Sequence, residues 1–486
     1  MGTRKFNPIF RHSGSLVLTV LLHIAFSTAA EAKELWVDTL SLGGSCSDAR
    51  TREQVGATTP WCSLDPAGDR AIAGDVVTVR KGTYSKVENC GSCNDNSVLQ
   101  VVNSGTSSAW IRFRAFPGEK VVISGGGGAY HGIQIIRTYD GRVPSFVSVQ
   151  GFEVTGFQGN CLSVKQTADV ILSGLDINAC SQGAVELHES ARVTLEDSRI
   201  HDNGLTGWTS AVDLYLCRQG NVVRRNRIWA NTDLDSRESE GHGVTMDYCD
   251  NNGSAIIESN VIWQNEGWCI ITFNSNNGVI RNNTCWMNGG NRSTTGEISI
   301  GGTNHSVHNN ILNPQSGRLA INVKSGGQAL AEFNLANGGW VLGRPDYLDF
   351  INADPMLVNP GAGDFHLGAG SPAIDSGDNA NAASIDADGN TRPQDGSGLG
   401  YARVDLGAYE YVQNSMNVDG DINGDGLVNA ADVLLAQRTL HGDYTLTGGQ
   451  FLRADVAPRV AGNPVPDGQF NAGDLLIILQ LALETN

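Results

Sequence analysis

The sequence predicts a mainly β protein in which a parallel β-helix, a solenoid of stacked coils, precedes a small α-helical domain with calcium loops. Similar segments of short strands recur through the middle of the chain, which is typical of a solenoid. Near the C-terminus, oxygen-bearing side chains follow the spacing of a calcium loop. We expect four parts: a signal peptide (1–32), the β-helix (33–350), a segment that closes the solenoid (351–413) and the calcium-loop domain (414–486).

The first 32 residues have the order of a secretory signal peptide. Three basic residues precede an apolar run over 16–26, and the small residues Ala30 and Ala32 offer a cleavage site. The run is shorter than the about 20 residues of a membrane-spanning helix, and no later segment qualifies. Cleavage after Ala32 removes three basic residues and one acidic residue, so the net charge changes from −18 to −20 (−18 − 3 + 1). We expect a secreted protein without a transmembrane segment. Its strongly negative net charge argues against nucleic acid as a partner.

The repeat consists of seven segments whose short β-branched strands are separated by Gly, Asn and Asp. When one residue of each is taken as an anchor, the steps between successive anchors are 23, 23, 28, 34, 23 and 27 residues. A short period with insertions, and no helix signal, predicts the all-β coils of a parallel β-helix. The anchors are Val149, Leu172, Leu195, Val223, Ile257, Ile280 and Val307.

Two columns of asparagine support the same alignment. One column lies three residues after the anchor and the other lies eight residues after it. Stacked Asn side chains can bond one another and the turn backbone from coil to coil, so we expect both columns to be structural. The columns are Asn226, Asn260, Asn283 and Asn310, and Asn203, Asn231, Asn265 and Asn288.

The opening of the mature chain resembles a known group of proteins. The stretches at 35–38, 60–84 and 104–125 are similar to the first coils of secreted right-handed β-helix proteins, many of which are polysaccharide lyases or related carbohydrate-active enzymes. The resemblance covers roughly residues 34–350. It implies a right-handed parallel β-helix. As the function, we expect binding and cleavage of an extracellular, acidic polysaccharide.

The strand before each anchor alternates apolar and polar residues, which predicts two outward columns on one face. The inward residues are Val164, Leu187, Leu214, Met246 and Ile271. The first outward column is Ser163, Glu186, Asp213, Thr245 and Ile270. The second outward column is Lys165, His188, Tyr215, Asp247 and Thr272. Since stacked coils lie about 4.8 Å apart, these columns bring together the densest set of titratable groups on the solenoid.

Two reactions fit this cluster. In an elimination, Ca²⁺ held by Glu186 and Asp213 or Asp247 binds a uronate carboxylate, and a nearby base removes the C5 proton. In a hydrolysis, two of the carboxylates serve as acid and base. We favour elimination, although the central coils of this face carry no Lys or Arg to act as a strong base. The candidate bases are Lys165, His188, Tyr215 and His242, the last beside an insertion expected to overhang the face.

Two other interpretations of this face stay open. It can be the ordinary polar face of a solvated solenoid, since such faces are usually charged. The protein can also be a non-catalytic carbohydrate-binding or adhesin-like solenoid. A further column, Trp229, Trp263 and Trp286, fits either a sugar platform or an aromatic ladder packed under a loop, and we favour packing.

All ten cysteines lie within residues 46–285, and an even number in an exported protein predicts disulfides. We expect Cys217 and Cys249 to join neighbouring coils, because each lies three residues after an inward residue. The Cys90–Cys93 spacing predicts a local bridge rather than a redox motif. For Cys269, a buried free thiol is the alternative.

The segment after the solenoid carries a specific motif. The stretches "GDFHLGAGSPAIDSGDNA" (363–380), "DADGNTRPQDG" (386–396) and "VDLGAYEY" (404–411) resemble the choice-of-anchor Q segment. In that family the segment ends a secreted β-helix and precedes one of several C-terminal modules. The resemblance names no catalytic group.

The calcium loop is "DINGDGLVNAAD", residues 421–432, followed by an apolar stretch that predicts a helix. Gly426 supplies the sharp turn at the sixth position of such a loop. This pattern, repeated, resembles a type I dockerin, which implies folding with calcium and binding to a cohesin-like partner. The expected ligands are the side chains of Asp421, Asn423, Asp425, Asn429 and Asp432 and the carbonyl of Leu427.

A second copy of this loop spans residues 455–483 and keeps Asp467, Asn471 and Asp474 in register. Counting back from Asp467 puts Asn463 at the first position and a valine at the third. Either Asp455 is the first ligand across an insertion, or the second site is weaker.

Overall fold

The computed structural model describes most of the 486-residue chain. The expected signal peptide, apart from Gly2, Glu31 and Ala32, and the Cys90–Cys93 pair lie outside the described residues. These are 2, 31–87, 96–234, 241–249, 254–290, 295–343, 347–396, 402–412, 419–423, 427–446, 448–460, 462–465 and 467–484.

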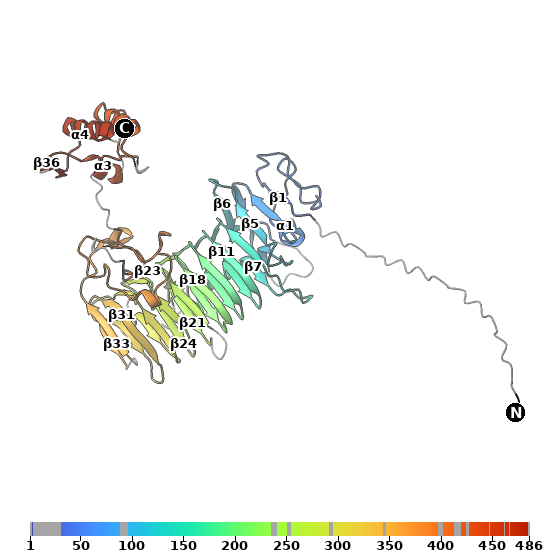
Figure 1. Cartoon of the computed structure of the whole chain (residues 1–486). Helices are drawn as coiled ribbons and strands as arrows, with labels where there is room; N and C mark the ends of the chain where they lie inside the picture. Colours follow the sequence, from blue (N-terminus) through green and yellow to red (C-terminus); the bar gives the residue numbers. More distant parts are fainter. Residues whose placement is uncertain are drawn as a thin grey trace.

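The solenoid is a stack of coils with up to three short strands each, and the strands of successive coils pair in parallel along its axis (Figure 1). Most positive-φ residues outside glycine mark the corners between strands, where the backbone turns sharply. The first strand of each coil belongs to one sheet, here called the site sheet. Its strands are β4 (Ser97–Gln100), β7 (His131–Ile136), β10 (Leu162–Lys165), β13 (Val185–His188), β17 (Val212–Tyr215), β21 (Val244–Asp247), β24 (Ile270–Phe273), β27 (Gly296–Ile300), β30 (Leu319–Val323) and β32 (Trp340–Leu342).

The other two strands of each coil form two parallel ladders. The first ladder is β1 (Glu34–Val37), β2 (Val76–Val79), β5 (Ile111–Ala115), β8 (Val147–Gln150), β11 (Ala168–Ser173), β14 (Ala191–Glu196), β18 (Gln219–Arg224), β22 (Ser254–Glu258), β25 (Val279–Arg281), β28 (His305–His308), β31 (Ala329–Ala336) and β33 (Tyr347–Asn352). The second ladder is β3 (Gly82–Tyr84), β6 (Val121–Ser124), β9 (Glu153–Thr155), β12 (Asp176–Asn178), β15 (Arg199–His201), β19 (Arg227–Trp229), β23 (Val261–Trp263), β26 (Thr284–Trp286) and β29 (Ile311–Asn313), which ends on the long strand β31.

The remaining elements are short strand pairs and helices. The strand pairs are β16 (Gly204–Leu205) with β20 (Thr232–Asp233), β34 (Leu357–Asn359) with β35 (Asp364–Leu367), and β36 (Arg459–Val460) with β37 (Asn463–Pro464). The helices are α1 (Asp65–Arg70), α2 (Ala430–Leu440), α3 (Gly448–Ala454), α4 (Ala472–Glu484) and the 3₁₀ turns η1 (Gly125–Gly127), η2 (Pro360–Ala362) and η3 (Asn379–Asn381). Within the described residues, no helix is long and apolar enough to cross a membrane.

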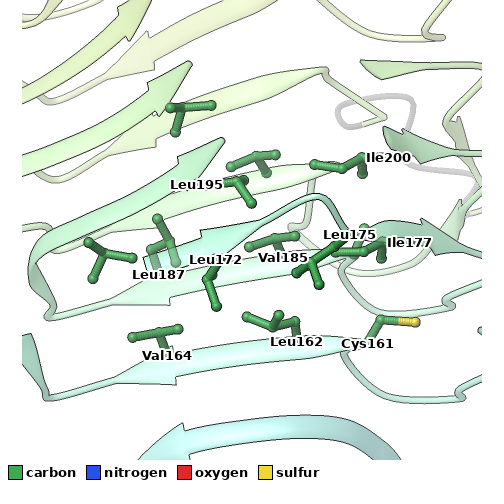
Figure 2. Close-up of a cluster of buried hydrophobic side chains, with 14 of the residues drawn as sticks. Cys161, Leu162, Val164, Leu172, Leu175, Ile177, Val185, Leu187, Leu195 and Ile200 are labelled. Atoms are coloured by element: carbon green, nitrogen blue, oxygen red, sulfur yellow. The ribbon is translucent and has the colours of Figure 1, made fainter. Parts of the chain in front are cut away.

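Inward-facing aliphatic side chains fill the space between the sheets, as Figure 2 shows for three neighbouring coils. Val164 and Leu187 from the site sheet meet Leu172 and Leu195 from the first ladder, and all four are fully buried. Each of these side chains stacks on its counterpart one coil away, since parallel strands repeat the same position. The apolar periodicity seen in the sequence is therefore the core of the solenoid.

The two asparagine columns form continuous buried ladders. In the first, Nδ2 of Asn226 donates to Oδ1 of Asn260 at 3.1 Å, and Nδ2 of Asn260 donates to Oδ1 of Asn283 at 3.0 Å. Each Oδ1 also accepts the backbone N–H of the preceding Asn, so the side chains bond the corners of the coils. The second ladder runs from Asn203 to Asn288 in the same way and ends on the buried carboxyl of Glu297. The expected structural role of both columns is confirmed.

Four disulfides link cysteines within the described residues. Cys217 pairs with Cys249 on the next coil, as expected. Cys269 pairs with Cys285, so the alternative of a free thiol at Cys269 was wrong. The other two bridges are Cys46–Cys62 and Cys161–Cys180.

The tryptophan column is packed under the segment that follows the solenoid. We call the described residues 355–396 and 402–412 the covering segment. Trp229 and Trp263 stack with ring centroids 4.7 Å apart, and Phe365 of the covering segment lies 5.1 Å from Trp263. Trp263 is only 7% exposed and shares a hydrophobic cluster with Phe365 and Tyr409. Packing, the interpretation favoured from the sequence, describes this column.

We predict that the substitution Asn260→Ala lowers the free energy of unfolding by at least about 2 kcal/mol. It removes the acceptor of the Asn226 N–H and the donor to the carbonyl of Val223, and it leaves the Asn226 side-chain amide with only its bond to Leu195. Each buried group left unpaired costs about 1–3 kcal/mol. Unfolding followed by circular dichroism measures the change. Asn381→Ala, at an exposed residue whose amide donates to Asp378, is the control. Equal unfolding midpoints for Asn260→Ala and the wild type would contradict the structural role of the ladder.

Candidate active site

The outward residues of four consecutive site-sheet strands form the candidate site. The register pairs Ser163, Glu186, Asp213 and Thr245 in one column. It pairs Lys165, His188, Tyr215 and Asp247 in the other. Both columns agree with the alignment predicted from the sequence, so six of the seven candidate residues lie on one face.

The predicted alignment is wrong by one residue at the next strand, β24. Met246 pairs with Thr272 rather than Ile271, and Asp247 pairs with Phe273. The physical reason is that Thr272 is a polar residue inside the solenoid, where its hydroxyl accepts from the N–H of Gly301 at 2.9 Å. Ile271 and Phe273 therefore continue the outward columns in place of Ile270 and Thr272.

Glu186 is held as a carboxylate by its neighbours. Its Oε2 accepts from Nδ2 of Asn160 at 2.5 Å and pairs with Nζ of Lys165 at 2.9 Å. Burial by itself would raise the pKa of Glu186, but the contacts with His188 and Lys165 outweigh it and lower the pKa. Glu186 is thus negatively charged across the neutral range.

The pKa of Asp213, on the next coil, is shifted in the opposite direction, upward. Its Oδ2 accepts one backbone N–H, from Ser210 at 2.9 Å. Burial raises the pKa of Asp213 to about 7, and the negative charges of Glu186 and Asp247 add to the increase. Near neutral pH Asp213 is therefore an equilibrium between acid and carboxylate, beside a fully ionised neighbour.

Asp247 lies one coil further along. Burial raises its pKa to about 6, while the N–H of Tyr248 and the charge of Lys324 act in the opposite direction. Its Oδ1 is buried and has no hydrogen-bond partner among the described residues. This carboxyl therefore has spare acceptor capacity at Oδ1.

His188 and Tyr215 lie between these carboxyl groups. Nδ1 of His188 is 3.6 Å from Oε1 of Glu186, and its ring packs edge to face on Tyr215 with centroids 4.9 Å apart. Lys165 is bound to Glu186 as a cation. It positions Glu186 and cannot accept a proton while that ion pair holds.

His242 lies at the corner two residues before β21, as Asn160 and Ser210 lie two residues before β10 and β17. His242 is 4% exposed, and its Nδ1 accepts the backbone N–H of Trp268 at 2.9 Å. His131 makes the same kind of bond to the N–H of Asn160 at an equivalent corner. His242 thus supports a corner of the coil through Nδ1, and its role as a base at the site stays a prediction.

The sequence analysis missed Asn160, which bonds Glu186, and the aromatic residues Tyr248 and Phe273. Asn160 lies in the corner before β10, where no periodic pattern marks it. Tyr248 follows the last residue of β21 in a left-handed conformation, φ 50°, so strand alternation does not include it. Phe273 was hidden by the misaligned register.

The first expected calcium loop folds around Asp432. The two carboxylate oxygens of Asp432 accept the N–H groups of Asn423 and Asn429, both at 3.0 Å. Asp421 and Asp432 are buried, while Asn423 and Leu427 are exposed. Asp425 lies outside the described residues. This donor set of carboxylates, amides and a carbonyl suits a hard cation such as Ca²⁺.

The second loop repeats this hydrogen bonding. The carboxylate of Asp474 accepts the N–H groups of Ala457 and Asn471, both at 2.8 Å. Ala457 is two residues after Asp455, as Asn423 is two residues after Asp421, so Asp455 occupies the first position. The strand pair β36–β37 is the insertion, and it contains Asn463.

Asp455 also closes the second loop from within. Its two oxygens accept the N–H groups of Asp467 and Gly468, and its side chain is 2% exposed. The third position is Ala457, which has no side-chain oxygen. The second loop therefore offers one ligand fewer than the first.

We predict that Asp213→Asn becomes more stable relative to the wild type as pH rises from about 4 to about 7. The pKa of Asp213 in the folded protein, about 7, exceeds the value of about 3.9 in an unfolded chain, so folding favours the protonated carboxyl. Its contribution to stability is full below pH 4 and is lost as pH rises to 7. Thermal melting of both proteins measures the difference, at most roughly 1.4 kcal/mol per pH unit. A constant difference between pH 4 and 8 would contradict the raised pKa.

Comparison with known proteins places this site on a recognised fold. A family model described as the right-handed β-helix region matches residues 131–311, which include every strand from β7 to β28 and thus the whole candidate site. No curated protein matches the chain.

Three solved structures are similar to the chain at low identity. A pectate lyase is 15% identical, with 78% of this chain and 96% of that chain covered and a TM-score of 0.48. The complex of XylC with xylose is 10% identical, with 77% and 98% covered and a TM-score of 0.45. An alginate lyase from Paenibacillus is 16% identical, with 66% and 99% covered and a TM-score of 0.40. The family-model match over residues 131–311 and the parallel pairing of the coils support a right-handed parallel β-helix that carries the candidate site.

Proposed function

We propose that this protein is secreted and that it binds and cleaves an extracellular polysaccharide on the site sheet, with Glu186 and Asp213 as its acid–base pair. The observation that carries the proposal is the opposite direction of the two pKa shifts on adjacent coils. Neighbouring carboxyl groups whose environments separate their pKa values are typical of paired acid and base catalysts. The disulfides of the coils support an oxidising, extracellular location.

In hydrolysis, each carboxyl group has a defined role. Asp213 in its protonated form donates to the leaving glycosidic oxygen, since its raised pKa keeps the proton available near neutral pH. Glu186 in its ionised form acts as the base that activates water or as the nucleophile. Lys165 and Asn160 orient Glu186 and keep it charged.

Elimination, which the sequence analysis favoured, is the second candidate chemistry. It is favoured by a specific observation: Asp213 and Asp247 both have raised pKa values, and Oδ1 of Asp247 is buried without a partner in the described residues. A Ca²⁺ ion held there would neutralise a uronate carboxylate and acidify the adjacent C–H group. His188 or Tyr215 would take the proton, because Lys165 is bound to Glu186.

We predict that Asp213→Asn and Glu186→Gln each lower cleavage by about 10²–10⁴-fold, the range for losing a positioned acid or base. The mature chain is incubated with pectins, alginates and glycosaminoglycans, with calcium and then with chelator. Reducing ends without unsaturated-product absorbance indicate hydrolysis, and absorbance that requires calcium indicates elimination. Glu153→Gln, on the second ladder of the solenoid, is the control and should leave the rate unchanged. Absence of any cleavage by the wild type would favour a non-catalytic carbohydrate-binding solenoid.

We propose that the C-terminal domain is a calcium-dependent, dockerin-like module that attaches the protein to a cohesin-like partner. Its helices α2, α3 and α4 pack on their own small core, which includes Ile422, Ala436 and Ile478. The matching hydrogen bonds of Asp432 and Asp474 support two related loops. Because the buried carboxylates repel one another without a cation, calcium binding should be coupled to folding of the module.

We predict that the mature chain binds calcium with two sites of unequal affinity, the second weaker because Ala457 replaces a ligand. Asp432→Ala should remove the tighter site and Asp474→Ala the weaker one, as measured by equilibrium dialysis or calorimetry. Asp443→Ala, at an exposed residue after α2, is the control and should bind as the wild type does. If both variants retain the stoichiometry of the wild type, the loops do not bind calcium.

A further inference from the structure

A second aromatic column lies on the site sheet and, unlike the tryptophan column, is exposed. We call Tyr215, Tyr248 and Phe273 the aromatic row. Their exposed fractions are 37%, 44% and 43%, whereas Trp263 in the covered column is 7% exposed. The chain thus covers one aromatic column with a dedicated segment and presents the other to solvent. Exposed apolar surface arranged in this way is typical of a binding site.

The row follows the solenoid axis from coil to coil. Tyr215 ends β17, Tyr248 follows β21, and Phe273 ends β24. The ring centroids are 6.2 Å apart for Tyr215 and Tyr248 and 6.0 Å apart for Tyr248 and Phe273, in edge-to-face contact. These mutual contacts fix the orientation of the rings while each keeps more than a third of its surface exposed.

The row runs directly beside the acid–base cluster. Asp247 precedes Tyr248 in the chain and is the register partner of both Tyr215 and Phe273. At the other side of Tyr215, the ring of His188 packs against it and approaches Glu186. A chain of sugar rings lying on the row would therefore pass along the carboxyl groups.

Both ends of the row are cationic. Nζ of Lys324 lies 5.0 Å from the ring centroid of Phe273. Beyond His188, a hollow of about 240 Å³ is lined by Ile136, Arg137, Lys165, Gln166 and His188. These cations are at the two ends of a face whose centre carries carboxyl groups of raised pKa, so they favour a ligand with negative substituents.

We propose that the aromatic row is a stacking platform that binds an acidic polysaccharide with the sugar chain parallel to the solenoid axis, one sugar unit following another from coil to coil. Because neighbouring rings of the row are turned by 87° and 75°, the sugar chain contacts some of them through their faces and others through their edges, with the apolar C–H groups of the pyranose rings against Tyr215, Tyr248 and Phe273. Carboxylate or sulfate groups approach Lys324 and the hollow beside Arg137. This inference rests on the proposed function for the position of the cleaved bond, but binding itself requires no cleavage.

The test measures binding in the Asp213→Asn background, in which we expect cleavage to be about 10²–10⁴-fold slower. Affinity electrophoresis in gels containing polygalacturonate, alginate or the neutral chain galactomannan reports retardation of the full mature protein. We expect retardation by at least one acidic chain, stronger than by galactomannan. Tyr215→Ala combined with Phe273→Ala should weaken that binding by about tenfold or more, whereas Tyr215→Phe should retain it because the ring is kept.

Matched controls separate this proposal from folding and from catalysis. Leu330→Ala removes an exposed apolar side chain from the first ladder and should bind as the parent does, and circular dichroism melting checks that each variant is folded. Unchanged binding in the double variant would overturn the proposal, as would stronger retardation by galactomannan or no retardation by any chain. If Asp213→Asn still cleaves while the row variants lose binding, the acid–base assignment fails and the platform stands.

Discussion

The hydrogen-bonded register between coils is the constraint on which the rest of the structure depends. Parallel strands about 4.8 Å apart place equivalent residues of successive coils directly over one another. A slip of one residue would move every inward side chain to the outside, so the register must be held firmly. The buried ladders from Asn226 to Asn334 and from Asn203 to Glu297 hold it, because each amide bonds the corner of the neighbouring coil. An amide ladder is specific to one register in a way that aliphatic packing alone is not.

The same register creates two aromatic columns, of which one is buried under another segment and the other is exposed. Trp229, Trp263 and Trp286 would expose a large apolar stripe, which the covering segment buries under Phe365 and Tyr409. Arg227 fixes this cover, since it donates to the hydroxyl of Tyr409 and to the carbonyl of Gly363. No described element covers Tyr215, Tyr248 and Phe273 in this way. The covering segment thus stabilises one side of the solenoid and leaves the site sheet open.

Much of the fold and part of the site could be predicted because the periodicity is local. From β10 to β21 the inward positions Val164, Leu187 and Met246 are all apolar, and the predicted columns are correct. The prediction failed at β24, where an inward threonine satisfies its hydroxyl within the core and so looks like an outward residue.

Contacts between distant residues had no local signal. Phe365 meets Trp263 across about 100 residues of sequence, and no pattern in either segment indicates the contact. Likewise, the inserted strand pair β36–β37 separates Asp455 from the rest of its loop, so counting along the chain could not choose between Asp455 and Asn463. The hydrogen bonds of Asp474 to Ala457 and Asn471 place Asp455, and not Asn463, at the first position of the loop.

Stacking also explains why the candidate site has unusual electrostatics. A solenoid repeats each outward position at the strand spacing, so acidic residues in neighbouring coils repel one another more strongly than scattered surface charges do. Glu186 escapes this repulsion through its ion pair with Lys165, and therefore stays ionised. Asp213 has no cation of this kind: burial and the negative charges of Glu186 and Asp247 outweigh its hydrogen bonds from Ser210, so it binds a proton more tightly instead. The regular stacking of coils thus produces an acid and a base from two carboxyl groups, because Lys165 pairs with Glu186 and no described cation pairs with Asp213.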